Sequence, residues 1–314
     1  MNKITIIGSG SVGSTVAYTL TVCGIASEIV MIDINNEKAI GEALDIRQGV
    51  SFCNPCQLYA GSYQDAADSD IVIITSGLPR KAGQSRLELT QTNIDILRSI
   101  TPEITRYAPN AVYVFVSDPV DLRTYAFTKW SGIPENRIIG SGTVLDTARL
   151  HSRLSEYYKI SQKNVHAYVL GEHGDSSFIP WSLANISAVP IHECHKSFSD
   201  KDNVLSEINY AEVEEYVKKS GGMIIERKGA TFYAVSISVA HICKCLLSRT
   251  DSTMTISTMM HGEYGVDDVC LSTLNTVGNM RVRGKVMLPL NDDEIRKLHE
   301  SAEKLKSIIK TVNI

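Results

Sequence analysis

The sequence predicts a doubly wound α/β fold in its first half, followed by a second region of mixed α and β structure. Short runs of β-branched residues alternate with helical patterns along the first half. The runs are apolar without alternation, as expected for parallel strands that helices cover on both faces. The 314 residues exceed the size of a typical single domain. We therefore expect two domains, residues 1–143 and 144–314.

The first half contains four predicted strands and at least two predicted helices. The strands are residues 4–7, 29–32, 71–75 and 112–117, and the helical stretches include residues 14–22 and 37–47. This alternation favours right-handed crossovers and a parallel sheet. Ligands of such sheets bind beyond the carboxyl ends of the strands, so functional residues are expected directly after each run.

The second half has longer helical patterns and a different order of elements. We expect helices at residues 145–158, 210–225 and 231–247, strands at residues 165–170, 254–261 and 269–274, and an amphipathic C-terminal helix that begins in residues 291–294. The sequence shows no internal repeat and no low-complexity linker. We therefore expect the domains to pack closely, with the substrate in the cleft between them.

Composition excludes several classes of partner. The net charge of −4 and the scattered Lys and Arg residues give no reason to expect nucleic acid. The longest apolar stretches fall short of the ~20 residues that a membrane-spanning helix needs. The first residues lead directly into a predicted strand and do not resemble a signal peptide. A protein that binds neither nucleic acid nor membrane is expected.

Seven cysteines form an odd set, which favours reduced thiols and a cytoplasmic location. Cys53 and Cys56 have the CxxC spacing of a redox pair or of half a zinc site, but no second CxxC completes such a site. A surface loop with two free thiols is the simpler interpretation. Adjacent ligand types at residues 192–195, His-Glu-Cys-His, do not converge in an ordinary polar loop, so no metal is expected.

The first strand is followed by a dinucleotide-binding fingerprint. Residues 8–13, Gly-Ser-Gly-Ser-Val-Gly, open the next helix, and Asp33 ends the following strand. Gly8, Gly10, Val12 and Gly13 allow a tight turn, at which a pyrophosphate meets free N–H groups. Asp33 can accept hydrogen bonds from ribose hydroxyls and would repel a 2′-phosphate, which favours NAD over NADP. The alternative is a structural turn with an ordinary Asp at a strand end.

Three further segments carry residues typical of catalysis. Residues 76–86 form a glycine-bounded loop, and Ser85 with Glu88 gives the following helix a capping box. Residues 142–150 read Gly-Thr-Val-Leu-Asp-Thr-Ala-Arg-Leu, and residues 171–175 read Gly-Glu-His-Gly-Asp. Together with the fingerprint and Gly-Glu-Tyr-Gly at residues 262–265, these segments resemble the L-lactate/malate dehydrogenase family, nearly end to end and in the family's order.

This resemblance implies a Rossmann NAD-binding domain, an α+β substrate domain and a site for a small 2-oxo or 2-hydroxy acid. His173 is then the proton donor, and Asp146 holds the other ring nitrogen and stabilises the imidazolium. Arg149, on the same helix face as Asp146, clamps the substrate carboxylate. Arg86 polarises the carbonyl when its loop closes. Taken one at a time, these residues could equally be a core histidine, a helix cap and solvated arginines.

The same resemblance places the cofactor and the substrate determinants. Ser76 and Gly77, directly after a strand, are expected to contact NAD. Arg80 occupies the position at which lactate dehydrogenases commonly carry Gln and malate dehydrogenases carry Arg, while Thr231 would narrow the pocket opposite the loop. The glutamate of residues 171–175 and the segment at residues 142–150 resemble the lactate type. We expect L-lactate dehydrogenase activity, with malate or a bulkier 2-hydroxy acid as alternatives.

Asp118 departs from the family pattern, which has Asn before Pro-Val-Asp near the nicotinamide and the substrate. An ionised carboxylate only accepts hydrogen bonds, so Asp118 would repel the substrate or donate as a neutral acid. It is also the one residue that favours a different interpretation, a catalytically impaired NAD-binding protein with a regulatory role. NADH oxidation with any 2-oxo acid would exclude that alternative.

Two further properties follow from the resemblance. Many bacterial lactate dehydrogenases bind fructose 1,6-bisphosphate through a pair of basic residues. His166 matches one of the pair, but His151 stands where the other is usually Arg, which puts activation in doubt. A homo-oligomer is also expected, with a tetramer favoured.

Overall fold

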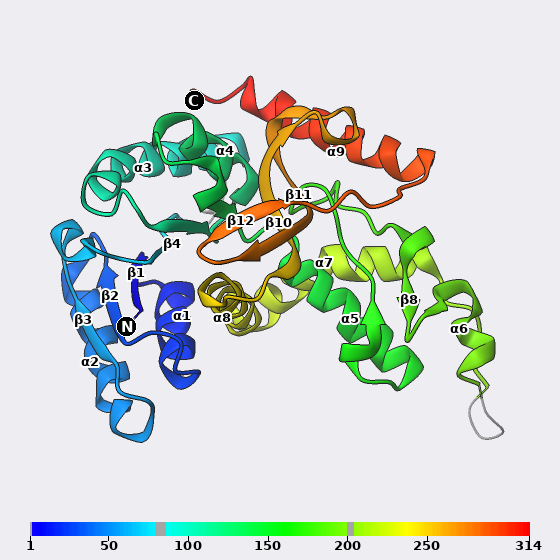
Figure 1. Cartoon of the computed structure of the whole chain (residues 1–314), viewed down its shortest axis with the longest axis horizontal. Coiled ribbons are helices and arrows are strands. Elements are labelled where there is room, and N and C mark those ends of the chain that lie inside the picture. The colour runs from blue at the N-terminus through cyan, green and yellow to red at the C-terminus, as the bar shows by residue number, and fades with distance from the viewer. Residues whose placement is uncertain (1, 79–85, 200–203) are drawn as a thin grey trace.

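Figure 1 shows the chain as a computed structural model that describes residues 2–78, 86–199 and 204–314. The α-helices of these ranges are α1 (Ser11–Val22), α2 (Asn36–Gln48), α3 (Arg86–Tyr107), α4 (Val120–Trp130), α5 (Val144–Tyr158), α6 (Ile191–Ser197), α7 (Tyr210–Lys228), α8 (Tyr233–Leu247) and α9 (Asp292–Ile309). The strands are β1 (Lys3–Ile7), β2 (Glu28–Ile32), β3 (Gln57–Ala60), β4 (Ile71–Ile74), β5 (Val112–Phe115), β6 (Ile138–Gly140), β7 (Val165–His166), β8 (Asn185–Ile186), β9 (Val189–Pro190), β10 (Ser252–His261), β11 (Asp267–Gly278) and β12 (Arg281–Lys285). None of the helices described is both long and apolar enough to cross a membrane.

The large sheet has the strand order β12-β11-β10-β6-β5-β4-β1-β2-β3. The six strands β1 to β6 run parallel. The strand order reverses between β1 and β4, which is the place where doubly wound sheets bind their ligands. The predicted doubly wound α/β fold is therefore confirmed.

Each central strand is buried on both faces, which explains why its sequence does not alternate. Ile4 and Ile6 of β1 pack into the core beside α1 and α8, whereas Ile7 packs into the core beneath α3 and α4. The same division holds along β4 and β5, where Val114 faces one core and Phe115 the other. A polar residue at any of these positions would lie in a core.

The sheet continues without interruption into the second half of the chain. β10, β11 and β12 form an antiparallel meander, and β10 joins the parallel part where Ser257 pairs with Gly140 of β6. A Cβ added at Gly140 would lie 2.6 Å from Thr124 Oγ1 and 2.9 Å from Ser257 Cβ, so this junction requires glycine. Helices α5 and α7 and the small sheet β7-β8-β9 lie beyond the meander (Figure 1).

Most predicted elements are confirmed with shifts of a few residues at their ends. The predicted strand at residues 165–170 is wrong beyond His166, because only Val165 and His166 pair with β8. Leu170 instead forms an isolated bridge with Phe178. The strands β3, β6, β8, β9 and β12 were not predicted. The predicted capping box at Ser85 lies outside the described residues.

Candidate active site

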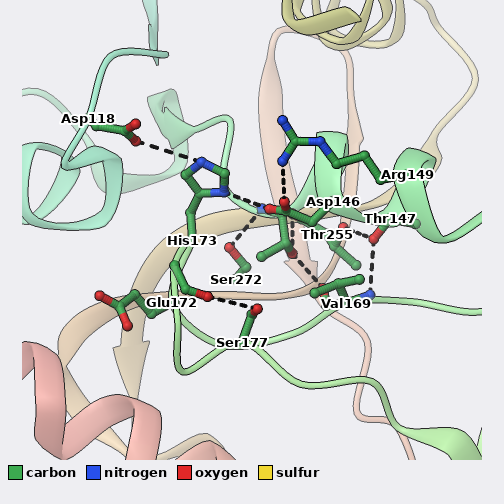
Figure 2. Close-up of polar contacts among 12 residues, drawn as sticks. Asp118, Asp146, Thr147, Arg149, Val169, Glu172, His173, Ser177, Thr255 and Ser272 are labelled. Atoms are coloured by element: carbon green, nitrogen blue, oxygen red, sulfur yellow. Dashed lines mark hydrogen bonds and ion pairs between the residues drawn. The ribbon is translucent and has the colours of Figure 1, made fainter. Parts of the chain in front are cut away.

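The helix α5 is anchored at its start so that its first turn faces the loop at residues 171–177. Thr143 N donates to Ser272 Oγ at 3.1 Å, and the hydroxyl of Thr147 lies 3.0 Å from that of Thr255. Thr147 Oγ1 also accepts a hydrogen bond from Val169 N at 3.0 Å. These contacts, drawn in Figure 2, fix the direction in which the other side chains of this turn point.

His173, Asp146 and Arg149 meet around one carboxylate (Figure 2). His173 Nδ1 lies 2.6 Å from Asp146 Oδ2, and Arg149 donates from a terminal nitrogen to Asp146 Oδ1 at 2.7 Å. The Asp146 side chain is 7% exposed and that of Arg149 is 15% exposed. Because an ionised carboxylate can only accept, His173 carries a proton on Nδ1 in this arrangement. The structure thus brings together three of the residues predicted from the sequence.

The charges of this group shift the titration of its members. The negative charge of Asp146 and its hydrogen bond raise the pKa of His173 above its usual range, although burial opposes that shift. Burial alone would raise the pKa of Asp146, but His173 and Arg149 outweigh it and leave that pKa below its usual value. The arrangement therefore favours an imidazolium held against a carboxylate.

The other ring nitrogen of His173 faces the open side of the site. Its Nε2 lies 3.7 Å from Asp118 Oδ1, and the Asp118 side chain is 74% exposed. Asp118 precedes Pro119 through a cis peptide bond, directly after β5. Figure 2 shows Asp118 beside this nitrogen. A group that receives a proton from Nε2 must therefore approach beside the Asp118 carboxylate.

Asp121 was not among the predicted site residues, yet it holds the main chain of His173. Its Oδ2 accepts a hydrogen bond from His173 N at 2.7 Å, and its Oδ1 has no hydrogen-bond partner among the described residues. Burial raises the pKa of Asp121 to about 7, against the lowering effects of the Ser257 side chain and of the bond from His173 N. The sequence signal for Asp121 is its place three residues after Asp118, in the segment Asp-Pro-Val-Asp at residues 118–121.

The loop that carries His173 is also held by the C-terminal helix α9, which the sequence did not indicate. Glu172 N donates to Ser301 Oγ at 2.7 Å, and Lys304 Nζ donates to Glu172 Oε2 at 2.9 Å. Ser176 Oγ also donates to Glu172 Oε2. A Cβ added at Gly171 would lie 2.8 Å from Ser301 Oγ, so close packing against α9 explains this glycine.

The glycine-rich turn between β1 and α1 has the space that a dinucleotide needs. A Cβ added at Gly13 would lie 1.8 Å from Gly8 O, so the close approach of these two residues leaves no room for a side chain at position 13. At Gly10, by contrast, a Cβ would meet nothing within 4 Å. Asp33 accepts hydrogen bonds from Ser9 N at 2.5 Å and Asn35 N at 2.8 Å. These residues fit a pyrophosphate at the start of α1 and a ribose beside Asp33.

The remaining predicted residues are placed less completely. Ser76 and Gly77 follow β4, the strand next to β1, and a Cβ at Gly8 would lie 2.7 Å from Ser76 N. Val12 lies partly buried in the first turn of α1. Thr231 lies half-buried between α7 and α8. Arg80 lies outside the described residues, and Arg86 is the first residue of α3 but its side chain is not described.

Two sequence models of known protein families match the chain. Residues 2–140 match the NAD binding domain of lactate/malate dehydrogenase, and residues 143–313 match the alpha/beta C-terminal domain of the same enzymes.

Curated proteins and solved structures are similar over the full length. The chain is 44% identical to an L-lactate dehydrogenase of Acetivibrio thermocellus, over 100% of this chain and 98% of that protein. It is 43% identical to L-lactate dehydrogenase 1 of Clostridium acetobutylicum, over 99% and 98%. The crystal structure of the minor L-lactate dehydrogenase from Enterococcus mundtii has a TM-score of 0.94 and 35% identity, covering 100% of this chain and 99% of that one.

Proposed function

The chain belongs to the lactate/malate dehydrogenase family, and from this membership we propose that it is an NAD-dependent L-lactate dehydrogenase that interconverts pyruvate and L-lactate. The observation that carries the proposal is the contact of His173 Nδ1 with Asp146, at 2.6 Å, on a carboxylate that also binds Arg149. A proton donor and a carboxylate-binding cation thus lie side by side. Reduction of a 2-oxo acid needs both.

NAD is the cofactor of this family's N-terminal domain. Gly8, Gly10, Val12 and Gly13 would hold its pyrophosphate at the start of α1, and Asp33 would bind the adenosine ribose. Ser76, Gly77 and Asp118, which follow the adjacent strands β4 and β5, would line the nicotinamide end. When bound, NADH supplies the hydride that reduces C2 of the substrate.

The protein side chains supply the rest of the chemistry. His173 Nε2 donates a proton to the carbonyl oxygen as C2 becomes a hydroxyl-bearing carbon. Asp146 keeps the ring oriented and favours its protonated form before the transfer. Arg149 binds the substrate carboxylate with the planar edge of its guanidinium, and Arg86 polarises the carbonyl. In the reverse direction, neutral His173 takes the proton from the lactate hydroxyl.

Pyruvate is the proposed 2-oxo acid, and oxaloacetate is the second candidate. Arg80, in the segment Leu-Pro-Arg-Lys at residues 78–81, favours a substrate with a second carboxylate, because a buried guanidinium without a partner is costly. The relatives named above, all L-lactate dehydrogenases, favour pyruvate. Thr231 would narrow the pocket against a bulkier acid.

Steady-state kinetics with NADH test the function and the substrate together. We expect kcat/KM to be higher for pyruvate than for oxaloacetate. A preference for oxaloacetate of about tenfold or more would make the enzyme a malate dehydrogenase. No oxidation of NADH with any 2-oxo acid would favour a regulatory NAD-binding protein.

We also propose a division at residue 143, with NAD bound by residues 1–143 and the substrate-binding side chains supplied mainly by residues 144–314. His173, Asp146 and Arg149 come from the second part, whereas Asp118 comes from the first. A cytoplasmic location is proposed because all seven cysteines are free thiols.

A homo-oligomer, with a tetramer favoured, is proposed from the surface. Exposed apolar side chains lie on α1, α2, α7 and α8, and α1 packs against both α2 and α8. They are Tyr18, Val22, Ile40, Leu44, Ile224, Ile225, Tyr233 and Ile237. Apolar surface of this kind marks interfaces. Sedimentation should give a multiple of the 34.5 kDa chain mass, and a monomer would contradict the proposal.

A further inference from the structure

The side chain of Glu172 folds back along the loop that carries His173. It is 13% exposed, and a Cβ added at Gly174 would lie 3.2 Å from its Oε1. Its Oε2 accepts a hydrogen bond from Ser176 Oγ. Because Glu172 and Ser176 lie on either side of His173 in the chain, this bond closes the short segment that contains the proposed proton donor.

Three elements hold this segment from outside. At its start, Gly171 N donates to Ser272 O of β11 at 2.9 Å. Helix α4 accepts a hydrogen bond from His173 N through Asp121, at 2.7 Å. The third element is α9, which binds both the main chain and the side chain of Glu172. His173 and the residue before it are therefore held by different helices.

The contacts with α9 are both neutral and charged. Ser301, which is 0% exposed, accepts a hydrogen bond from Glu172 N at 2.7 Å and lies 3.1 Å from Ser176 Oγ. Three residues further along α9, Lys304 donates from Nζ to Glu172 Oε2 at 2.9 Å, and its side chain is 39% exposed. Loss of Lys304 would leave a largely buried carboxylate without this countercharge, which is costly.

We propose that Lys304 is a positioning residue that, through Glu172, holds the loop at residues 171–177 on α9 and thereby keeps the His173 ring against Asp146. The inference rests on the proposed function, because His173 is the proton donor of that reaction. Lys304 binds the residue before His173, so its effect reaches the ring through the main chain. His173 Nδ1 lies 2.6 Å from Asp146, and a displacement of about 1 Å at a catalytic group can cost about 10²-fold in rate.

The charges around His173 make the sign of the effect informative. They are Asp146 and Arg149 of α5, Asp121 of α4, Asp118 after β5, and the pair of Glu172 with Lys304. Asp146 is the largest cause of the raised pKa of His173. Movement of the ring away from Asp146 would therefore lower that pKa, whereas loss of the Lys304 charge alone would raise it.

The test is Lys304→Met in the full-length enzyme, with Lys306→Met as the matched control. Methionine keeps an unbranched apolar side chain but removes the charge. Lys306 lies on the same helix and pairs with Asp267 at 3.3 Å and with Glu303 at 3.7 Å, so its loss removes an equal charge from other partners. Lys304→Arg keeps a cation at the position. Steady-state kinetics with pyruvate and NADH, below the unfolding temperature of each variant, give kcat, KM and their pH dependence.

In Lys304→Met we expect kcat for pyruvate to fall about tenfold, because the proton donor is displaced. The KM for NADH should stay within about twofold of the wild type. The fall of kcat with rising pH should move to lower pH by about one unit, because the ring lies farther from Asp146. Lys304→Arg should remain within about threefold of the wild type, and Lys306→Met should match the wild type in kcat and pH profile.

A purely structural Lys304 gives a different result. The unfolding temperature then falls in Lys304→Met, but kcat and the pH profile of the folded enzyme stay those of the wild type, which overturns the proposal. A profile that moves to higher pH also overturns it, because the charge alone then acts on His173. The double variant Glu172→Gln/Lys304→Met should lose no more than the larger of the two single losses. Single losses that multiply show that Lys304 does not act through Glu172, and they overturn the proposal.

A failure of the proposed function is recognised separately. If the wild type oxidises NADH with neither pyruvate nor oxaloacetate, that function is wrong. The position of the ring is then followed by NMR titration of the His173 imidazole, whose signal is assigned by its absence in His173→Gln. The pKa of His173 should be lower in Lys304→Met than in the wild type and in Lys306→Met. An equal or higher pKa overturns the role of Lys304.

Discussion

The two sides of His173 differ in almost every physical respect. On the α5 side, Nδ1 meets Asp146 at 2.6 Å, and this carboxylate is 7% exposed with a partner on each oxygen. On the β5 side, Nε2 lies 3.7 Å from Asp118, whose side chain is 74% exposed. The Asp146 side of the ring is therefore the closed side, and the Asp118 side is the open side, which a ligand can reach.

This difference separates orientation from reaction. Asp146 and the hydrogen bond from His173 N to Asp121 fix where the ring lies, and the negative charge of Asp146 favours the protonated ring. Only Nε2 can be reached by a substrate, so proton transfer must occur on the open side. Substitutions on the Asp146 side should therefore abolish activity or shift its pH dependence. Substitutions on the Asp118 side should change kcat/KM by smaller factors.

The largest effect is expected for the ring that both sides share. In His173→Gln, the proton donor is lost while the polar contact with Asp146 can be kept, and kcat for pyruvate reduction should fall by about 10³-fold or more. NADH binding, measured by fluorescence titration, should change little because the fingerprint lies in the turn between β1 and α1. Turnover within about tenfold of the wild type would contradict the role of His173.

The next effect is expected on the closed side. Asp146→Asn removes the charge that raises the pKa of His173 and leaves Arg149 without its partner, so kcat/KM should fall by about 10²-fold to 10³-fold.

The pH dependence of the activity should also change in Asp146→Asn, in a direction that the raised pKa of His173 determines. Because the His173 pKa is raised, its imidazolium persists above the usual range, and pyruvate reduction should hold through neutral pH and fall as the pH rises through that pKa. In Asp146→Asn the fall should move to lower pH. Lactate oxidation needs neutral His173, so its rise should move in the same direction. A profile that does not move would show that Asp146 only orients the ring.

On the open side a smaller effect of opposite sign is expected. Asp118→Asn removes the repulsion between Asp118 and the substrate carboxylate and supplies a neutral donor, so kcat/KM for pyruvate near neutral pH should rise about threefold to tenfold. Asp45→Asn, an exposed position on α2, makes the same charge change away from the site and serves as the control. Equal pH–rate profiles for wild type and Asp118→Asn would discard the idea.

The sequence predicted the elements whose burial is uniform along the chain. The strands β1, β4 and β5 are buried on both faces, so each appears as an uninterrupted apolar run. The strand β3 begins with an exposed Gln57 and lies at the sheet edge, and β6 has three residues. Residues 165–170 are β-prone but mostly unpaired, because strand pairing depends on partners that are distant in the sequence.

The site was predictable where local spacing places residues together. Asp146 and Arg149 are three residues apart on one helix, so their shared face follows from helix geometry. Asp121 and Arg123 were not predictable in this way, since charged residues at a helix start are usually solvated. Both side chains are buried because α4 packs beneath β4, β5 and the loop that carries His173.

The smallest effect is expected from a sugar bisphosphate, and it tests whether the closed side is rigid. His151 lies on α5, the helix of Asp146 and Arg149, and its Nε2 is 2.8 Å from Ala167 O. Burial lowers the pKa of His151, so the ring is neutral at pH 7 and binds phosphate less well than arginine. Fructose 1,6-bisphosphate at about 5 mM should change kcat/KM by less than about twofold, whereas His151→Arg, beside the exposed His166, should gain a response. Strong activation of the wild type would mean that a ligand can move α5, and the closed side of the site would then be adjustable.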